Sequence, residues 1–181
     1  MHKNKEHINV VWFKRDLRLQ DNEAIANALN SNKRTLLLYV FENILLNDDH
    51  YSQRHFNFIK ESIRDLNQQL KSHNTKVLAV NSDIIGAFNN LQEFYKIDAV
   101  FSHVETGILV TYKRDKEFKR YCRNNLINWN ENKNNGVQRG LVNRNDWFES
   151  VEIYMQQELE LFKPKNNQLL NHIEIETLES V

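Results

Sequence analysis

The sequence predicts an α/β fold, a Rossmann-like doubly wound parallel sheet of five strands in the order 3-2-1-4-5 with helices on both faces. Two observations predict it. Short apolar runs alternate with helical periodicities from residue 8 to residue 130. One of these runs, residues 35–41, is apolar almost without interruption, which is typical of a strand that is covered on both faces. Right-handed crossovers would connect such strands.

The first strand is expected over residues 8–13, and a charged turn follows it at once. The turn ends at Asp21, a good N-cap residue for a helix over residues 22–30 that carries Ile25 and Leu29 on one face. A strand, a charged turn and a capped helix are how an open α/β sheet begins. The turn would therefore lie at the carboxyl end of the strand, the edge where such sheets bind ligands.

The later elements continue this alternation. Further strands are expected over residues 35–41, 75–80, 98–103 and 127–130. A long helix from Ser52 to about Ser72 has the clearest apolar stripe, with Phe56, Ile59, Ile63, Leu66 and Leu70. A helix capped by Ser82 or Asp83 places on one face Ile84, Phe88, Leu91 and Tyr95. A charge-rich helix runs from Gly107 to about Asn124, and a polar loop over residues 42–50 lies at the carboxyl edge, where loops often shape a site.

Composition excludes several classes of protein. The formal net charge is zero, whereas a chain whose main task is to grip nucleic acid is usually basic. The single cysteine, Cys122, cannot form an intrachain disulfide, and no spacing of cysteine and histidine suggests a zinc site. No apolar run suits a signal peptide or a membrane span, so we expect a reduced, cytoplasmic protein.

The chain divides, on this interpretation, into an α/β domain over residues 1–147 and a linker or tail over residues 148–181. From Phe148 the sequence turns acidic and loses a clear period. The only proline, Pro164, lies in a polar segment that reads as a linker, and the residues after 167 are too few to bury a core. We expect this tail to lead toward a further domain.

The charged turn carries the first candidate site. Lys14, Arg15 and Arg18 surround Asp16, and guanidinium groups can hold an anionic or polar planar ligand through paired hydrogen bonds. The alternative is that Asp16 pairs with a neighbouring arginine to fix the turn, or that all four side chains are solvated, as exposed ion pairs commonly are. The turn holds no glycine and the chain has no Walker A loop, which argues against standard dinucleotide and NTP-hydrolysing sites.

Other polar residues are expected at the same edge. Glu105 follows the fourth strand and is a candidate ligand acceptor, while His103 is more often a hydrogen-bonded edge residue. Arg54 opens the long helix and either points into the same crevice or is an ordinary surface residue. Cys122 is expected to be buried and inert. No nucleophile–base pair is evident, so we assign no catalytic residue and no metal ligand.

Residues 12–22, which read WFKRDLRLQDN, resemble the opening motif of the DNA photolyase/cryptochrome family. That motif is Trp-Phe, a basic residue, a variable position, Asp-Leu-Arg, and then Asp-Asn or Asp-His. Residues 52–54 resemble the family's Ser-x-Arg. The segments 102–107, 111–115 and 136–147 resemble a bacterial branch that usually has Gln where Val104 stands. The resemblance runs in order over residues 8–165.

The resemblance implies the N-terminal domain of a deoxyribodipyrimidine photolyase, a carbon–carbon lyase and flavoprotein that repairs pyrimidine dimers in DNA. In this family the α/β domain can hold an antenna chromophore, which passes blue-light excitation to FAD in a helical C-terminal domain. Reduced FAD then donates an electron to the dimer. The chain ends before that helical domain, so we expect it to be inactive alone and to meet DNA only through the missing part, without any membrane contact.

The resemblance also bears on the antenna. Family members that bind folate place Asn-Glu where this chain has Val110 and Thr111, and Val104 removes a polar group from the expected mouth. FMN or a deazaflavin is therefore expected in preference to folate, and a site that binds no chromophore is an equal alternative. The residues expected to hold the chromophore are Lys14, Arg15, Asp16, Arg54 and Glu105. Two other classes stay open: a cryptochrome-type blue-light photoreceptor and a free-standing nucleotide- or flavin-binding module.

Overall fold

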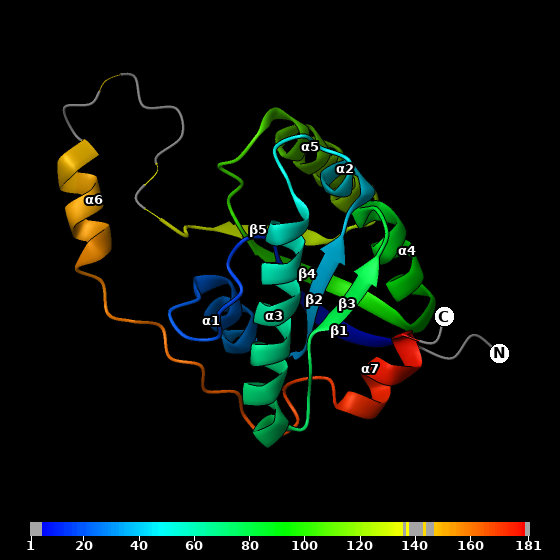
Figure 1. Ribbon diagram of the computed structural model, residues 1–181. Helices are drawn as coiled ribbons and strands as arrows, with labels where there is room; N and C mark the ends of the chain where they lie inside the picture. Colours follow the sequence, from blue (N-terminus) through cyan, green and yellow to red (C-terminus); the bar gives the residue numbers. More distant parts are fainter. Residues whose placement is uncertain (1–4, 136, 138–142, 144–146, 180–181) are drawn as a thin grey trace.

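A computed structural model describes residues 5–135, 137, 143 and 147–179 (Figure 1). Within them, one sheet of five parallel strands has the order β3-β2-β1-β4-β5, which confirms the predicted fold class and strand order. The strands are β1 (Glu6–Phe13), β2 (Arg34–Phe41), β3 (Leu78–Asn81), β4 (Tyr95–His103) and β5 (Asn128–Asn132). Most of the quoted segment 136–147 lies outside the described residues.

Helices cover both faces of the sheet (Figure 1). Helices α1 (Glu23–Asn30) and α3 (Gln53–Leu70) pack on one face. The other face is covered by α4 (Ile84–Phe94), α5 (Leu109–Asn124) and α7 (His172–Glu179). The remaining helices are α2 (Asn43–Leu46), α6 (Trp147–Met155) and the short 3₁₀ helix η1 (Lys71–His73). None of the described helices is long and apolar enough to cross a membrane.

The central strand β1 shows how the sequence produces two hydrophobic layers. Side chains alternate between the two faces of a strand. Ile8, Val10 and Trp12 enter the layer beneath α4 and α5, whereas Val11 and Phe13 enter the layer beneath α1 and α3. All five are at most 1% exposed, which explains why the sequence shows an uninterrupted apolar run rather than alternation.

Several predicted boundaries change. The N-cap of α1 is Asn22 rather than Asp21: its side-chain oxygen accepts the Ile25 backbone N–H at 3.1 Å, while Asp21 takes a left-handed φ of 51°. Tyr95 does not extend the face of α4, because its backbone is already extended and it begins β4. The loop after β2 contains α2.

The C-terminal segment packs against the sheet, which the sequence analysis does not predict. Leu169 forms a parallel bridge with Thr35, next to β2. Leu170 and Ile175 have no exposed surface and belong to the layer that contains α4 and α5. The hydroxyl of Thr75 donates to the Leu170 carbonyl at 2.5 Å. The division of the chain at residue 147 stays a prediction.

Candidate functional site

A cavity of about 830 Å³ lies at the carboxyl edge of the sheet. Its walls come from the segments after β1, β2 and β4 and from the first turns of α3. Because β1 is flanked by β2 on one side and β4 on the other, the order in which successive strands are added to the sheet reverses here. Doubly wound sheets bind ligands at this point. The volume is that of a typical cofactor pocket. All five predicted site residues line it: Lys14, Arg15, Asp16, Arg54 and Glu105.

Asp16 fixes the turn after β1. Its carboxylate accepts the Lys14 backbone N–H at 3.1 Å and is hydrogen-bonded to Nδ1 of His103 at the end of β4. Burial alone would raise the pKa of this carboxyl, but the hydrogen bond and the charge of His103 outweigh it and hold that pKa below its usual value. Asp16 therefore pairs with a histidine rather than with the arginine considered above, and its side chain is only 1% exposed.

Lys14 points away from solvent. Its Nζ lies 2.7 Å from Oδ2 of Asp115, and both side chains are less than a tenth exposed. The ammonium also lies 4.6 Å from the ring centre of Trp12 and 5.2 Å from that of Trp129. Burial lowers the pKa of Lys14, and the charge of Asp115 opposes this. Lys14 thus joins α5 to the end of β1 beneath the cavity.

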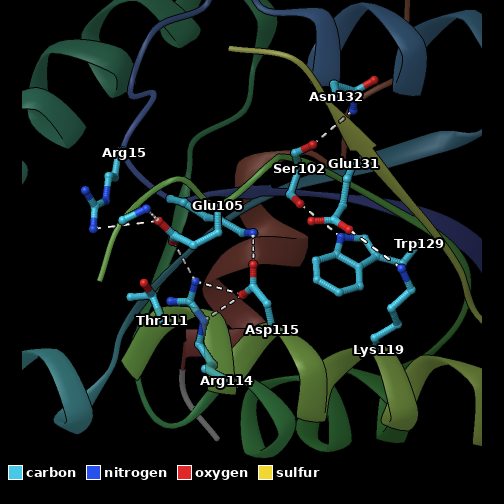
Figure 2. A network of polar contacts seen from close by, with 12 residues as sticks. Arg15, Ser102, Glu105, Thr111, Arg114, Asp115, Lys119, Trp129, Glu131 and Asn132 are labelled. Carbon is cyan, nitrogen blue, oxygen red and sulfur yellow. Dashed lines mark hydrogen bonds and ion pairs between the residues drawn. The ribbon is translucent and has the colours of Figure 1, made fainter. Parts of the chain in front are cut away.

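Arg114 is the centre of the buried charge network (Figure 2). Its Nε donates to Asp115 at 2.9 Å, and its Nη2 donates to Oε2 of Glu105 at 3.1 Å. Its Nη1 donates to Oε1 of Glu42, the residue that follows β2, at 2.6 Å. Arg114 thereby fixes carboxylates that follow two different strands, and a planar guanidinium is suited to this because its donors have fixed directions.

Glu42 and Arg114 also belong to this site, although neither was a predicted site residue. The loop over residues 42–50 was expected at this edge, and Arg114 lies in the segment 111–115 that carries part of the family resemblance. The only available signal for Glu42 was its position directly after a buried strand. Glu42 is 3% exposed, and burial raises the pKa of its carboxyl while the charge of Arg114 opposes that shift. Both residues line the cavity.

Arg15 and Arg54 supply positive charge at the mouth of the cavity. Arg15 is half exposed, and its Nη2 lies 3.7 Å from Oε1 of Glu105 and 3.1 Å from the hydroxyl of Tyr51. Arg54 is exposed, and its guanidinium has no hydrogen bond or ion pair with any residue the structure describes. Anionic groups of a ligand can bind both side chains without displacing a buried ion pair.

Gly107 is required for the placement of Arg15. Its backbone N–H donates to Oε1 of Glu105 at 2.7 Å. A Cβ at this position would lie 2.1 Å from Nη2 of Arg15 and 2.6 Å from the same Glu105 oxygen. Only glycine lets the arginine and the glutamate meet over this backbone.

A group of aromatic side chains, the aromatic wall, also lines the cavity. It is formed by Tyr39, Tyr51, His55, Phe56 and Phe58. The rings of Tyr51 and Phe56 are stacked, with centres 5.8 Å apart, and Phe58 is 69% exposed. A planar heterocycle fits such a wall because aromatic faces stack on one another. The cavity therefore combines a surface for a flat ring with cations for an anionic tail.

Nothing in the described part of the chain points to metal chemistry. Among those residues, no group of three or more His, Cys, Asp or Glu is arranged to hold a metal ion. Cys122 lies in the hydrophobic layer under α5, and burial raises the pKa of its thiol to about 12.

Comparison with known proteins gives one consistent result. Residues 9–173 match the family model described as DNA photolyase. A curated relative, the chloroplastic/mitochondrial cryptochrome DASH of Solanum lycopersicum, is 30% identical over an alignment of 105 residues. That alignment covers 55% of this chain and 18% of the relative. The matched part therefore spans less than a fifth of the relative's length.

Solved structures show the same fold. A photolyase from Sulfolobus tokodaii superposes with a TM-score of 0.70 at 18% identity, over 96% of this chain and 41% of its own. A cryptochrome from Synechocystis gives a TM-score of 0.75 at 16% identity, over 94% and 38%. A class III photolyase from Agrobacterium tumefaciens gives 0.70 at 14% identity, over 95% and 36%.

Proposed function

Because the chain belongs to the DNA photolyase family, we propose that it is the chromophore-binding α/β domain of a deoxyribodipyrimidine photolyase. The observation that carries this proposal is the cavity at the carboxyl edge, whose lining brings together Arg15, Arg54 and Glu105 with an aromatic wall. The chromophore in this cavity absorbs light and passes the excitation to FAD in a helical domain. That second domain holds the DNA and carries out the repair.

A flavin or deazaflavin suits the cavity better than a folate. The aromatic wall accommodates the tricyclic ring, and Arg15 and Arg54 neutralise a phosphate or phosphate-like tail at the mouth. The position that folate-binding relatives fill with glutamate is Thr111, and its hydroxyl donates to the Ile108 carbonyl at 2.7 Å. The Sulfolobus tokodaii photolyase, which shares this fold, is described with two FAD molecules, which imply a novel light-harvesting cofactor in that protein.

Titration of the chain with FMN, followed by quenching of flavin fluorescence, tests the proposal. Two variants remove mouth cations, Arg15→Ala and Arg54→Ala. Each should weaken FMN binding about tenfold, which corresponds to the lower end of the about 1.5–3 kcal/mol that a hydrogen bond to a charged group contributes, because both side chains are solvent-exposed. Arg64→Ala is the matched control, because Arg64 is an exposed arginine of the same helix α3 that does not line the cavity. Absence of binding, or equal loss in all three variants, would remove the assignment.

A cryptochrome-type photoreceptor is the second candidate function, since a cryptochrome DASH and a cryptochrome structure are among the similar proteins. A repair assay on the full-length protein from its organism distinguishes the two functions. Purified protein is illuminated with blue light in the presence of an oligonucleotide that carries a thymine dimer. A photolyase restores the two thymines, whereas a photoreceptor binds FAD and leaves the dimer intact.

A further inference from the structure

Helix α5 carries a cluster of positive charge on its outer face. Its cations, which together form the basic face, are Lys113, Lys116, Lys119, Arg120 and Arg123. All five are exposed, and with Glu117 they line an open hollow of about 500 Å³. The buried residues of the same helix, Phe118 and Cys122 among them, lie on the opposite side. The helix therefore turns its apolar side to the sheet and the basic face to solvent.

Most of this charge has no partner within the part of the chain that the structure describes. The side chains of Lys113, Arg120 and Arg123 form no hydrogen bond or ion pair with any described residue. Lys119 lies 4.0 Å from Oε2 of Glu131, at the limit of an ion pair (Figure 2). The whole chain has equal numbers of basic and acidic residues, so its zero net charge conceals this local excess.

The basic face does not stabilise the helix that carries it. Side chains three or four positions apart are neighbours on a helix, and like charges at these spacings destabilise it. On α5, five such pairs join two cations, whereas two pairs join Glu117 to a cation. Only Arg123 lies in the last turn, where a cation interacts favourably with the helix dipole. Bound anions would remove the repulsion among the other cations.

The dimensions of the basic face suit a nucleic-acid backbone. From Lys113 to Arg123 the helix rises about 15 Å. Successive phosphates of one DNA strand are spaced about 3.4 Å apart along the duplex, so this length faces about four phosphates. A membrane surface suits α5 less well, because an interfacial helix inserts its apolar side into the lipid, and that side of α5 is buried against the sheet.

We propose that the basic face of α5 binds the phosphate backbone of double-stranded DNA. Contacts of this kind position a protein on the duplex without reading its base sequence. The choice of DNA over another polyanion rests on the proposed function, in which the whole protein acts on a lesion in DNA. The basic face then adds a contact to DNA within this chain, and that contact requires no lesion.

The salt dependence of binding counts the phosphate contacts. Fluorescence anisotropy is measured on the full chain with a labelled, undamaged duplex of about 20 base pairs, at NaCl concentrations from about 25 to about 100 mM. Each phosphate contact contributes about 0.9 to the slope of log affinity against log salt, so five contacts predict an affinity about 500-fold lower at the higher salt.

Two triple variants test whether α5 supplies these contacts. Lys113→Gln/Lys116→Gln/Arg120→Gln leaves two cations on the basic face, and the same change in salt should then lower the affinity only about 12-fold. The matched control removes two lysines and one arginine from α3 and the residue after it. These residues are exposed, do not line the cavity, and are Lys60, Arg64 and Lys71. The control, with all three changed to Gln, should keep the salt dependence of the unaltered chain, because it alters the net charge equally but leaves the basic face intact.

The fold of the α5 variant is checked by circular dichroism and a melting curve. Its melting temperature should equal or exceed that of the unaltered chain, because like charges have been removed from a helix. Poly-L-glutamate is the probe for an acidic protein partner. If poly-L-glutamate binds more tightly than the duplex and the α5 variant loses this binding, the basic face serves an acidic protein and the inference is wrong.

The FMN titration described above, carried out on the same preparation, separates this inference from the proposed function. If the chain binds FMN but not the duplex at low salt, or if both triple variants lose the same share of the salt dependence, the basic face is not a DNA contact and the chromophore site stands. If the chain binds the duplex through α5 but does not bind FMN, the proposed chromophore site fails and the DNA contact stands.

Discussion

Replacement of Arg114 by methionine is the perturbation that tests the buried network most severely. Methionine keeps much of the volume and removes the charge. The change leaves three buried carboxylates without their shared cation: Glu42, Glu105 and Asp115. Of these, the carboxylate of Glu42 has no other hydrogen-bond partner among the described residues, whereas Asp115 retains Lys14 and Glu105 retains Gly107.

The expected loss follows from this geometry. Removal of one partner of a buried ion pair destabilises a protein by about 3–5 kcal/mol. Arg114 is 6% exposed on its side chain and its partners are 3–8% exposed, so solvent does little to reduce this figure. A domain of this size loses about 2–4 °C in melting temperature for each kcal/mol, so Arg114→Met should melt about 6–20 °C below the unaltered chain.

Urea unfolding at pH 7, followed by circular dichroism, measures the free energy of unfolding. Arg18→Met is the control, since the Arg18–Asp21 pair is exposed and 3.7 Å long, and it should change stability by less than about 1 kcal/mol. Adding Glu42→Gln to Arg114→Met should restore part of the loss, because a neutral amide does not need a buried cation. If Arg114→Met and Arg18→Met lose equal stability, the network does not hold the carboxyl edge together.

Three further predictions concern the rest of the domain. Cys122, whose thiol pKa burial raises to about 12, should stay unreactive toward a disulfide reagent at pH 8 until urea unfolds the chain, and immediate reaction would contradict its burial. Leu170→Ala should lower the free energy of unfolding by about 2–5 kcal/mol, because Leu170 is fully buried. Leu159→Ala, at a position that is 69% exposed, should change the free energy of unfolding little. Equal effects of the two substitutions would show that the C-terminal segment does not pack on the sheet. The hydrogen bond and charge of Arg34 lower the pKa of Glu174, so the ionised carboxylate stabilises the fold at pH values above its unfolded pKa of 4.5, and this stabilisation is lost as the pH falls. Glu174→Gln should therefore lower the urea midpoint at pH 7 but change it much less at pH 3. A difference in midpoint that is the same at both pH values would refute the pairing.

The sequence predicted the sheet because the physics of a parallel strand is local and repetitive. A strand covered on both faces needs an apolar run, and β1 and β2 each supply one. The long stripe of α3 is equally explicit, since its buried residues recur at helical spacing. Segments that follow parallel strands all lie at the carboxyl edge of the sheet, so the order of strands and turns in the sequence was enough to place the five predicted residues at that edge.

Roles within the site could not be predicted in the same way, because they depend on partners far away in the chain. Asp16 bonds to His103, which lies 87 positions later, and Arg114 reaches back 72 positions to Glu42. Nothing in the residues around Asp16 distinguishes a carboxylate that fixes a turn from one that holds a ligand. The packing of Leu170 under the sheet is likewise a long-range contact from a segment with no helical or strand period.

The central claim is that the carboxyl-edge cavity holds a planar chromophore, and NMR of the ¹⁵N-labelled chain with FMN tests it most directly. Backbone amide shifts should change for residues 13–18, 42–58 and 105–111, the three segments that line the cavity. Shifts that cluster instead around β3 and α7, or an unchanged spectrum at millimolar FMN, would contradict the claim.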